Sequence, residues 1–132
     1  RLDGKAGEMV EARTFDELFH EFGKIRVVKV DVEGHEDDVF IGMTASLQSG
    51  LIENIVFEEF RPSPSPACFI LQSYGYYTYL IDRTFLAPRL IPTGQSPRRI
   101  KGEPTNILAV KSERRLEELT SSGWRCLGPW WS

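Results

Sequence analysis

The valine-rich run from Ile25 to Val32 constrains the fold of this chain more than any other segment. Because successive side chains of a strand point to opposite faces, apolar residues at both odd and even positions indicate a strand that is covered on both sides. The run carries such residues at Val27, Val28, Val30 and Val32. It therefore predicts a central, parallel strand of a buried sheet.

Segments typical of helices and strands alternate around this run. Helical spacing of apolar residues predicts helices over 14–23, 35–49, 68–74 and 113–119. Apolar extended runs predict further strands over 54–60, 76–82 and 106–111. Thr14 and Glu17 have the spacing of a capping box, and Gly23 and Gly50 stand where helices would end. This order predicts an α/β fold with right-handed crossovers.

The chain is expected to form a single partial domain over residues 1–132, since its length is that of one domain. Residues 83–105 are punctuated by prolines and predict one long loop, and residues 112–132 predict a C-terminal tail. If this loop leaves the sheet beside the acidic strand ends described below, it can cover a substrate or attract an anionic one; a solvated insertion is the alternative. Its basic residues are Arg83, Arg89, Arg98, Arg99 and Lys101.

Composition excludes several classes of function. The net charge of -3 gives no overall attraction to nucleic acid or to anionic lipid, and no stretch reaches the roughly 18 apolar residues that span a membrane. Cys68 and Cys126 are too few for a disulfide framework, so a reducing, cytoplasmic compartment is expected. The sequence begins at Arg1 without an initiator Met or a secretory signal, and we expect it to be part of a longer protein.

Acidic residues close two neighbouring strands of the predicted sheet. Asp31 and Glu33 close the first strand, and Glu58 and Glu59 close the second. Because the carboxyl ends of parallel strands meet at one side of a sheet, we expect these carboxylates to share a crevice. There they could bind a divalent cation, act as a general base on a hydroxyl, or hold sugar hydroxyls by hydrogen bonds. His35 adjoins them and is of the residue type that titrates near neutral pH.

Two other interpretations of this segment compete with a catalytic one. Glu36, Asp37 and Asp38 start a predicted helix, where negative side chains are stabilised by the helix dipole whatever the function. Gly34, His35 and Asp37 also match a fragment of a zinc-peptidase motif. That interpretation is disfavoured, because two histidines in the whole chain leave too few ligands for such a site.

The segment from Val28 to Glu36, VKVDVEGHE, closely resembles the signature of FkbM-type methyltransferases, which use S-adenosylmethionine. Shorter segments in the same order resemble other parts of that family: TFDEL at Thr14, IVFE at Ile55, the glycine–tyrosine step at Gly75, and NILAV at Asn106. The resemblance extends from residue 13 to residue 111.

The resemblance implies an α/β fold that is the C-terminal half of a class I, Rossmann-like methyltransferase sheet, with three parallel strands, an antiparallel last strand and flanking helices. It also implies transfer of a methyl group from S-adenosylmethionine to a hydroxyl of a small molecule or sugar. Asp31 and Glu33 would line the junction of cofactor and acceptor, Asp31 also binding the cofactor, while His35 and Glu58 would orient or deprotonate the hydroxyl. A divalent metal held by Asp31 with Glu58 or Glu59 is an open alternative.

The chain lacks the glycine-rich turn that the resemblance assigns to the cofactor, since none of its 11 glycines forms a Gly-x-Gly pair. We therefore expect the isolated chain to be inactive and to bind S-adenosylmethionine poorly, with an N-terminal half supplied from outside. Without that half, residues 27–32 would form an apolar sheet edge, which predicts a homo-oligomer partner, another partner chain or poor solubility. A non-catalytic, methyltransferase-like interaction module is the alternative function.

Overall fold

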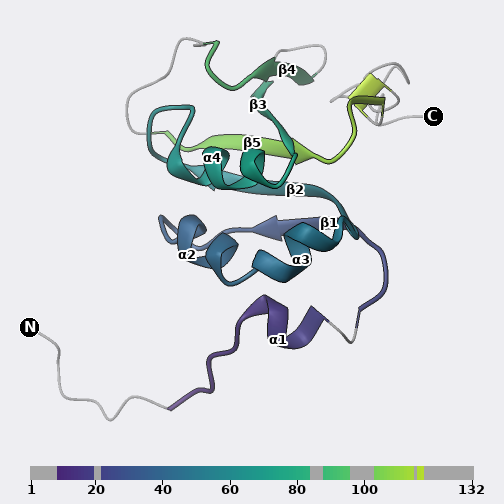
Figure 1. Ribbon diagram of the computed structural model, residues 1–132. Coiled ribbons are helices and arrows are strands. Elements are labelled where there is room, and N and C mark those ends of the chain that lie inside the picture. Colours follow the sequence, from purple (N-terminus) through teal and green to yellow (C-terminus); the bar gives the residue numbers. More distant parts are fainter. Residues whose placement is uncertain (1–8, 20–21, 84–87, 96–102, 115, 118–132) are drawn as a thin grey trace, which may run out of the picture.

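A computed structural model describes residues 9–19, 22–83, 88–95, 103–114 and 116–117. These residues form a mixed five-stranded sheet with short helices (Figure 1), which confirms the predicted α/β class. The helices are α1 (Phe15–Phe19), α2 (Glu36–Ile41), α3 (Thr44–Ser49) and α4 (Pro66–Ser73). The strands are β1 (Ile25–Val30), β2 (Ile52–Glu59), β3 (Tyr77–Arg83), β4 (Pro88–Pro92) and β5 (Thr105–Val110).

The strands lie side by side in the order β1-β2-β5-β3-β4. β1 and β2 are parallel, whereas β5 is antiparallel to both of its neighbours, β2 and β3. β3 therefore runs in the same direction as β1 and β2, and these three strands end at the same side of the sheet. We call that side the carboxyl rim.

β1 is the outermost strand on one side of the sheet, and β2 is its only partner among the described residues. Val30 is buried, but Val27 is 58% exposed. The prediction of a central strand covered on both faces is therefore wrong for β1. The expectation that this segment forms an apolar sheet edge is confirmed.

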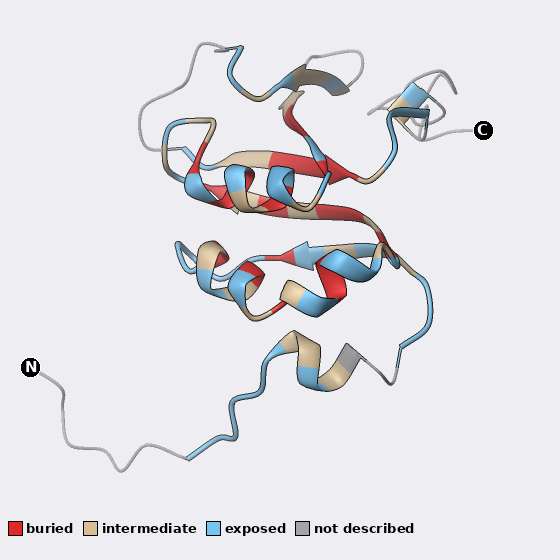
Figure 2. Ribbon diagram, viewed as in Figure 1, coloured by how far each residue is buried: buried red, intermediate tan, exposed pale blue. Residues whose placement is uncertain are grey.

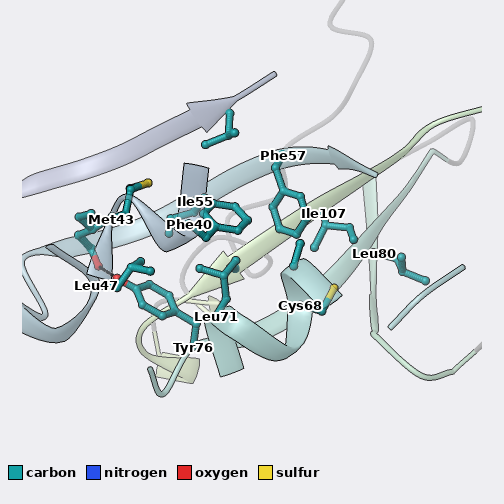
Figure 3. Close-up of a cluster of buried hydrophobic side chains, with 14 residues drawn as sticks. Phe40, Met43, Leu47, Ile55, Phe57, Cys68, Leu71, Tyr76, Leu80 and Ile107 are labelled. Carbon is teal, nitrogen blue, oxygen red and sulfur yellow. Dashed lines mark hydrogen bonds between the residues drawn. The ribbon is translucent and has the colours of Figure 1, made fainter. Parts of the chain in front are cut away.

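α2, α3 and α4 lie on one face of the sheet (Figure 1), and the main hydrophobic core fills the space between them and the strands (Figure 3). Phe40 of α2 packs edge to face on Phe57 of β2, with ring centroids 5.2 Å apart. Burying one side chain of this size stabilises the fold by roughly 1.5–3 kcal/mol. Other fully buried members of the core are Met43, Leu47, Ile55, Cys68, Leu71 and Ile107.

The opposite face of the sheet, which we call the open face, carries the alternate strand residues. Tyr79, Leu108 and Val110 form a smaller buried cluster there, and Leu116, from the helical residues after β5, packs against it. Figure 2 shows that buried residues concentrate in β2 and β5, whereas β1 is largely exposed. The polar end of this face lies at the carboxyl rim and contains the candidate site.

The single helix predicted over 35–49 is divided into α2 and α3 by Asp16 of α1. The Asp16 carboxylate accepts hydrogen bonds from the backbone N–H groups of Ala45 (2.7 Å) and Ser46 (2.9 Å). In a continuous helix these groups would bond to the carbonyls of Ile41 and Gly42. Those carbonyls instead accept from the Thr44 hydroxyl and from the Asp16 backbone N–H, respectively. Asp16 therefore caps α3 from a distant part of the chain.

The capping box at Thr14 and Glu17 is confirmed, because each side chain accepts a hydrogen bond from the backbone N–H of the other residue. α1 is described as far as Phe19, residues 20–21 lie outside the described residues, and Phe22, just before the predicted stop at Gly23, is not helical. The predicted stop at Gly50 is confirmed, since Gly50 ends α3 in the left-handed conformation with φ 70°.

The prediction of one long loop over 83–105 is wrong in part, because β4 forms an antiparallel hairpin with β3. The predicted basic residues Arg98, Arg99 and Lys101 lie outside the described residues, as does the tail beyond residue 117. In the part of the chain that the structure describes, no helix is both long and apolar enough to cross a membrane.

Candidate functional site

Lys29, Asp31 and Glu58 meet on the open face at the carboxyl rim, and we call them the rim cluster. Lys29 Nζ donates a hydrogen bond to Asp31 Oδ2 over 2.7 Å. Lys29 pairs in register with Val56 of β2. Glu58 lies two residues after Val56 on the same face of β2, because side chains alternate along a strand, and its charge acts on Lys29. The structure thus brings two of the predicted site residues, Asp31 after β1 and Glu58 in β2, close to the same lysine.

The rim cluster is a charged site that solvent can reach. The hydrogen bond with Asp31 raises the pKa of Lys29, and the negative charges of Asp31 and Glu58 raise it further, so this lysine is a cation at neutral pH. The side chains of Lys29 and Asp31 are 62% and 46% exposed. Glu58 is half-buried and lies opposite Asn106 of β5, which adds an amide group to the same end of the face.

Glu59 does not belong to this site, which corrects the expectation that both terminal glutamates of β2 share one crevice. It points to the helical face, where it is 1% exposed and bonded to the Arg61 guanidinium at 2.8 Å. Arg61 also bonds to both carboxylate oxygens of Asp37, at 2.6 and 2.8 Å. Burial raises the pKa of Glu59, but the hydrogen bonds from Arg61 and Ser65 outweigh burial and hold this pKa below its ordinary value. This network ties the end of β2 to α2.

Glu33 and His35 lie in the turn between β1 and α2. Glu33 has φ 50° and Gly34 has φ 102°, so two consecutive residues with positive φ reverse the chain before the helix begins. Glu33 is exposed on this turn. His35 stands at the N-cap position of α2, and its Nδ1 lies 3.1 Å from Oδ2 of Asp38. The contacts of His35 thus lead toward α2, and not toward the rim cluster.

The acidic residues that start α2 have different roles. Glu36 is fully buried and accepts a hydrogen bond from the Gly34 backbone N–H, which braces the turn. Asp37 is held by Arg61, and this contact lowers the pKa of Asp37. Among the described residues, no group of three or more histidine, cysteine, aspartate or glutamate side chains could hold a metal ion. Since Glu59 faces the other side of the sheet, a metal shared by Asp31 and Glu59 is ruled out by their positions.

Lys29 was missed as a site residue. Its spacing from Asp31 could have revealed it, because residues two apart on a strand share a face. Arg61 was also missed. Its partner Glu59 is two residues before it, but its other partner, Asp37, lies on a different element, so the link to α2 has no local signal.

The rim cluster can bind and polarise a hydroxyl group. Two neighbouring carboxylates can accept hydrogen bonds from hydroxyls or take up a proton, and a lysine ammonium can donate to a hydroxyl oxygen. Carboxylates on an accessible face also attract a cationic group such as an ammonium or sulfonium ion.

The FkbM methyltransferase domain family matches residues 3–77 of the chain, which is more than half of its 132 residues. The match covers α1 to α4 and reaches the first residue of β3, and it includes the whole rim cluster. Neither a curated protein nor a solved structure matches the chain significantly. The chain belongs to the FkbM methyltransferase domain family.

Proposed function

We propose that this chain forms the acceptor side of an S-adenosylmethionine-dependent O-methyltransferase, with the rim cluster at the place of methyl transfer. The observation that carries the proposal is the position of Asp31 and Glu58. They come from the FkbM-like segment and from the next strand, and they lie together at the carboxyl rim. Ligands of α/β sheets bind at this side of the sheet.

The arrangement of the strands supports the proposal. Three strands, β1, β2 and β3, share one direction, and the last strand, β5, is antiparallel and inserted between β2 and β3. This is the combination of directions expected for the C-terminal half of a class I, Rossmann-like methyltransferase sheet. β4 is an additional strand at the outer side of β3.

The residues of the rim cluster are suited to holding the acceptor hydroxyl during methyl transfer. S-adenosylmethionine, when bound, supplies an activated methyl group on a sulfonium centre. Asp31 and Glu58 are placed to hold the acceptor hydroxyl in line with that group and to take up its proton. Glu33 and His35 remain predicted contributors to the acceptor side, from the turn beside the cluster.

The adenosine end of the cofactor lacks a matching element in this sequence, because no Gly-x-Gly pair is present. We propose that an additional protein segment supplies this part of the site and that the 132-residue chain alone neither binds the cofactor tightly nor turns over. The acceptor is a small molecule or sugar with a free hydroxyl. The family assignment supports methyl transfer, and the carboxylates of the rim cluster support oxygen as the acceptor atom.

The proposal is tested with the intact protein that carries this chain. It is incubated with S-adenosylmethionine labelled in the methyl group and a panel of sugars and other hydroxyl compounds, and labelled products are identified by mass spectrometry. Asp31→Asn removes the carboxylate and is expected to lower the rate by about 100-fold or more, as for loss of an aligned proton acceptor. Glu11→Gln is the control, because Glu11 is an exposed carboxylate that pairs with Arg13 and contacts none of the predicted site residues.

Methylation at oxygen that depends on Asp31 and not on Glu11 supports the proposal. Labelling of nitrogen or carbon would overturn the O-methyltransferase assignment. Unchanged activity in Asp31→Asn would overturn the role of the rim cluster, and absence of transfer to every acceptor would favour a non-catalytic interaction module.

A further inference from the structure

The rim cluster holds two carboxylates of like charge on neighbouring strands, and only one of its members is positive. Like charges side by side on a sheet destabilise one another, and an interposed cation offsets that repulsion. Lys29 is within hydrogen-bond distance of Asp31, and the charge of Glu58 also acts on it.

Lys29 reaches these carboxylates because of its place on β1. It pairs with Val56 and points to the open face, one strand position before the end of β1 at Val30. Asp31 lies just beyond that end, outside the pairing of β1 with β2. The hydrogen bond from Lys29 therefore joins its side chain to a residue inside the strand.

We propose that Lys29 is a positioning residue, whose ammonium group holds the carboxylate of Asp31 in one orientation on the open face. Nothing in a structural role for β1 requires this lysine, since its side chain is largely exposed and packs into neither core cluster. The consequence for catalysis rests on the proposed function, because it assumes that Asp31 receives the acceptor hydroxyl.

The orientation of Asp31 is measured by NMR in the labelled 132-residue chain, from three-bond couplings that report its χ1 angle. In the wild-type chain Asp31 is expected to occupy one rotamer. In Lys29→Met the couplings are expected to average over several rotamers, and Lys29→Arg, which keeps a cation with donors, is expected to restore the single rotamer. Lys24→Met is the matched control, because Lys24 forms an exposed ion pair with Glu53, away from Asp31, and should leave its couplings unchanged.

A second measurement leaves Lys29 in place and changes the carboxylates near it, so that the proposal stays testable if Lys29→Met folds poorly. The pKa of Lys29 is followed by NMR of its side chain and is expected to fall in Asp31→Asn and, by less, in Glu58→Gln. Averaged couplings of Asp31 already in the wild type, a single rotamer in Lys29→Met, or a pKa of Lys29 that both variants leave unchanged would overturn the proposal.

In the intact protein, Lys29→Met is expected to lower kcat by about tenfold or more, since misplacement of an aligned group slows the chemical step. The KM for the acceptor should change less, and Lys29→Arg should recover most of the rate. An equal loss of kcat in Lys29→Met and Lys24→Met would contradict a positioning role. If the intact wild-type protein transfers no methyl group, the proposed function fails, while the couplings and the pKa still decide whether Lys29 positions Asp31.

Discussion

Arg61 links two carboxylates from different elements, Glu59 at the end of β2 and Asp37 in α2. Removing a partner from a buried ion pair leaves an uncompensated charge, and Glu59 is almost fully buried. Because Arg61 itself is one-third exposed, we expect Arg61→Met to lower the free energy of unfolding by about 2–3 kcal/mol, below the range for a fully buried pair. Urea unfolding measures this change.

Arg13→Met is the matched control for Arg61, because Arg13 forms an exposed pair with Glu11. Its expected effect is about 0.5 kcal/mol or less. Equal effects of the two substitutions would show that the network of Arg61 does not stabilise the fold.

Asp16 makes stability depend on pH. Burial raises the pKa of this carboxyl, but hydrogen bonds from Ser46 and Ala45 outweigh burial and hold the pKa below its ordinary value of 3.8. The stabilisation is therefore complete above pH 3.8 and is lost as the pH falls through the lower pKa of the folded state. Asp16→Asn removes the negative charge and replaces one of the two accepting oxygens by an amide donor, and is expected to cost about 1 kcal/mol at neutral pH.

Unfolding of Asp16→Asn and wild type is compared at neutral pH and below pH 3, with Asp38→Asn as the exposed control. The difference between Asp16→Asn and wild type should shrink in acid. A difference that stays constant with pH would show that the carboxylate of Asp16 is not the group responsible.

The sequence allowed Asp31 and Glu58 to be predicted at the same rim, because they lie at the carboxyl ends of adjacent parallel strands. The same alternation along the strand places Glu58 and Glu59 on opposite faces. The prediction that both share one crevice was therefore wrong on sequence grounds alone. The exposure of His35 depends on the two residues with positive φ before it, and of these only Gly34 is a type that signals such a turn.

At the scale of elements, Gly50 and Gly42 form a matched pair for testing helix ends. Gly50 has φ 70°, and an added Cβ would meet its nearest atom at 3.8 Å, so Gly50→Ala costs backbone strain alone. We expect Gly50→Ala to destabilise the fold by about 1–2 kcal/mol. Gly42 has φ -73°, which alanine adopts freely, so Gly42→Ala is expected to be neutral or to stabilise by up to about 1 kcal/mol.

Thermal and urea unfolding of these two alanine variants provide the measurement. Equal destabilisation by both would contradict the assignment of a left-handed conformation to Gly50 and not to Gly42. It would also place the division between α2 and α3 in doubt, since that division depends on the conformation near Gly42.

β1, β2, β3 and β5 were predictable from their apolar runs, and each begins and ends within two residues of the expected range. The division of one predicted helix into α2 and α3 was not predictable, because the responsible carboxylate is 29 residues before Ala45. β4 was not predicted, because its terminal residues, Pro88 and Pro92, are typical of irregular structure. Its pairing with β3 is a contact that the sequence of the segment alone does not indicate.

At the scale of the whole molecule, the exposed side of β1 predicts association. Its outer backbone groups have no strand partner among the described residues, and Val27 is an exposed apolar residue beside them. Such an edge recruits another strand unless charge opposes pairing. We therefore expect the 132-residue chain to self-associate, and Val27→Lys to reduce that association.

Sedimentation velocity at several concentrations measures the association. Ile41→Lys is the control, because Ile41 is an equally exposed apolar residue on α2, away from the edge of β1. A wild-type chain that is monomeric at every concentration would contradict the prediction, as would equal effects of Val27→Lys and Ile41→Lys.

The central claim is that Asp31 and Glu58, from two strands, act as one catalytic unit in methyl transfer. A double-mutant cycle tests it in the intact protein, with kcat/KM measured for wild type, Asp31→Asn, Glu58→Gln and the combined variant. Residues that act as a unit give non-additive losses, so each single change is expected to lower kcat/KM strongly and the combined change only slightly more. Losses that multiply, or full activity in either single variant, would contradict the claim.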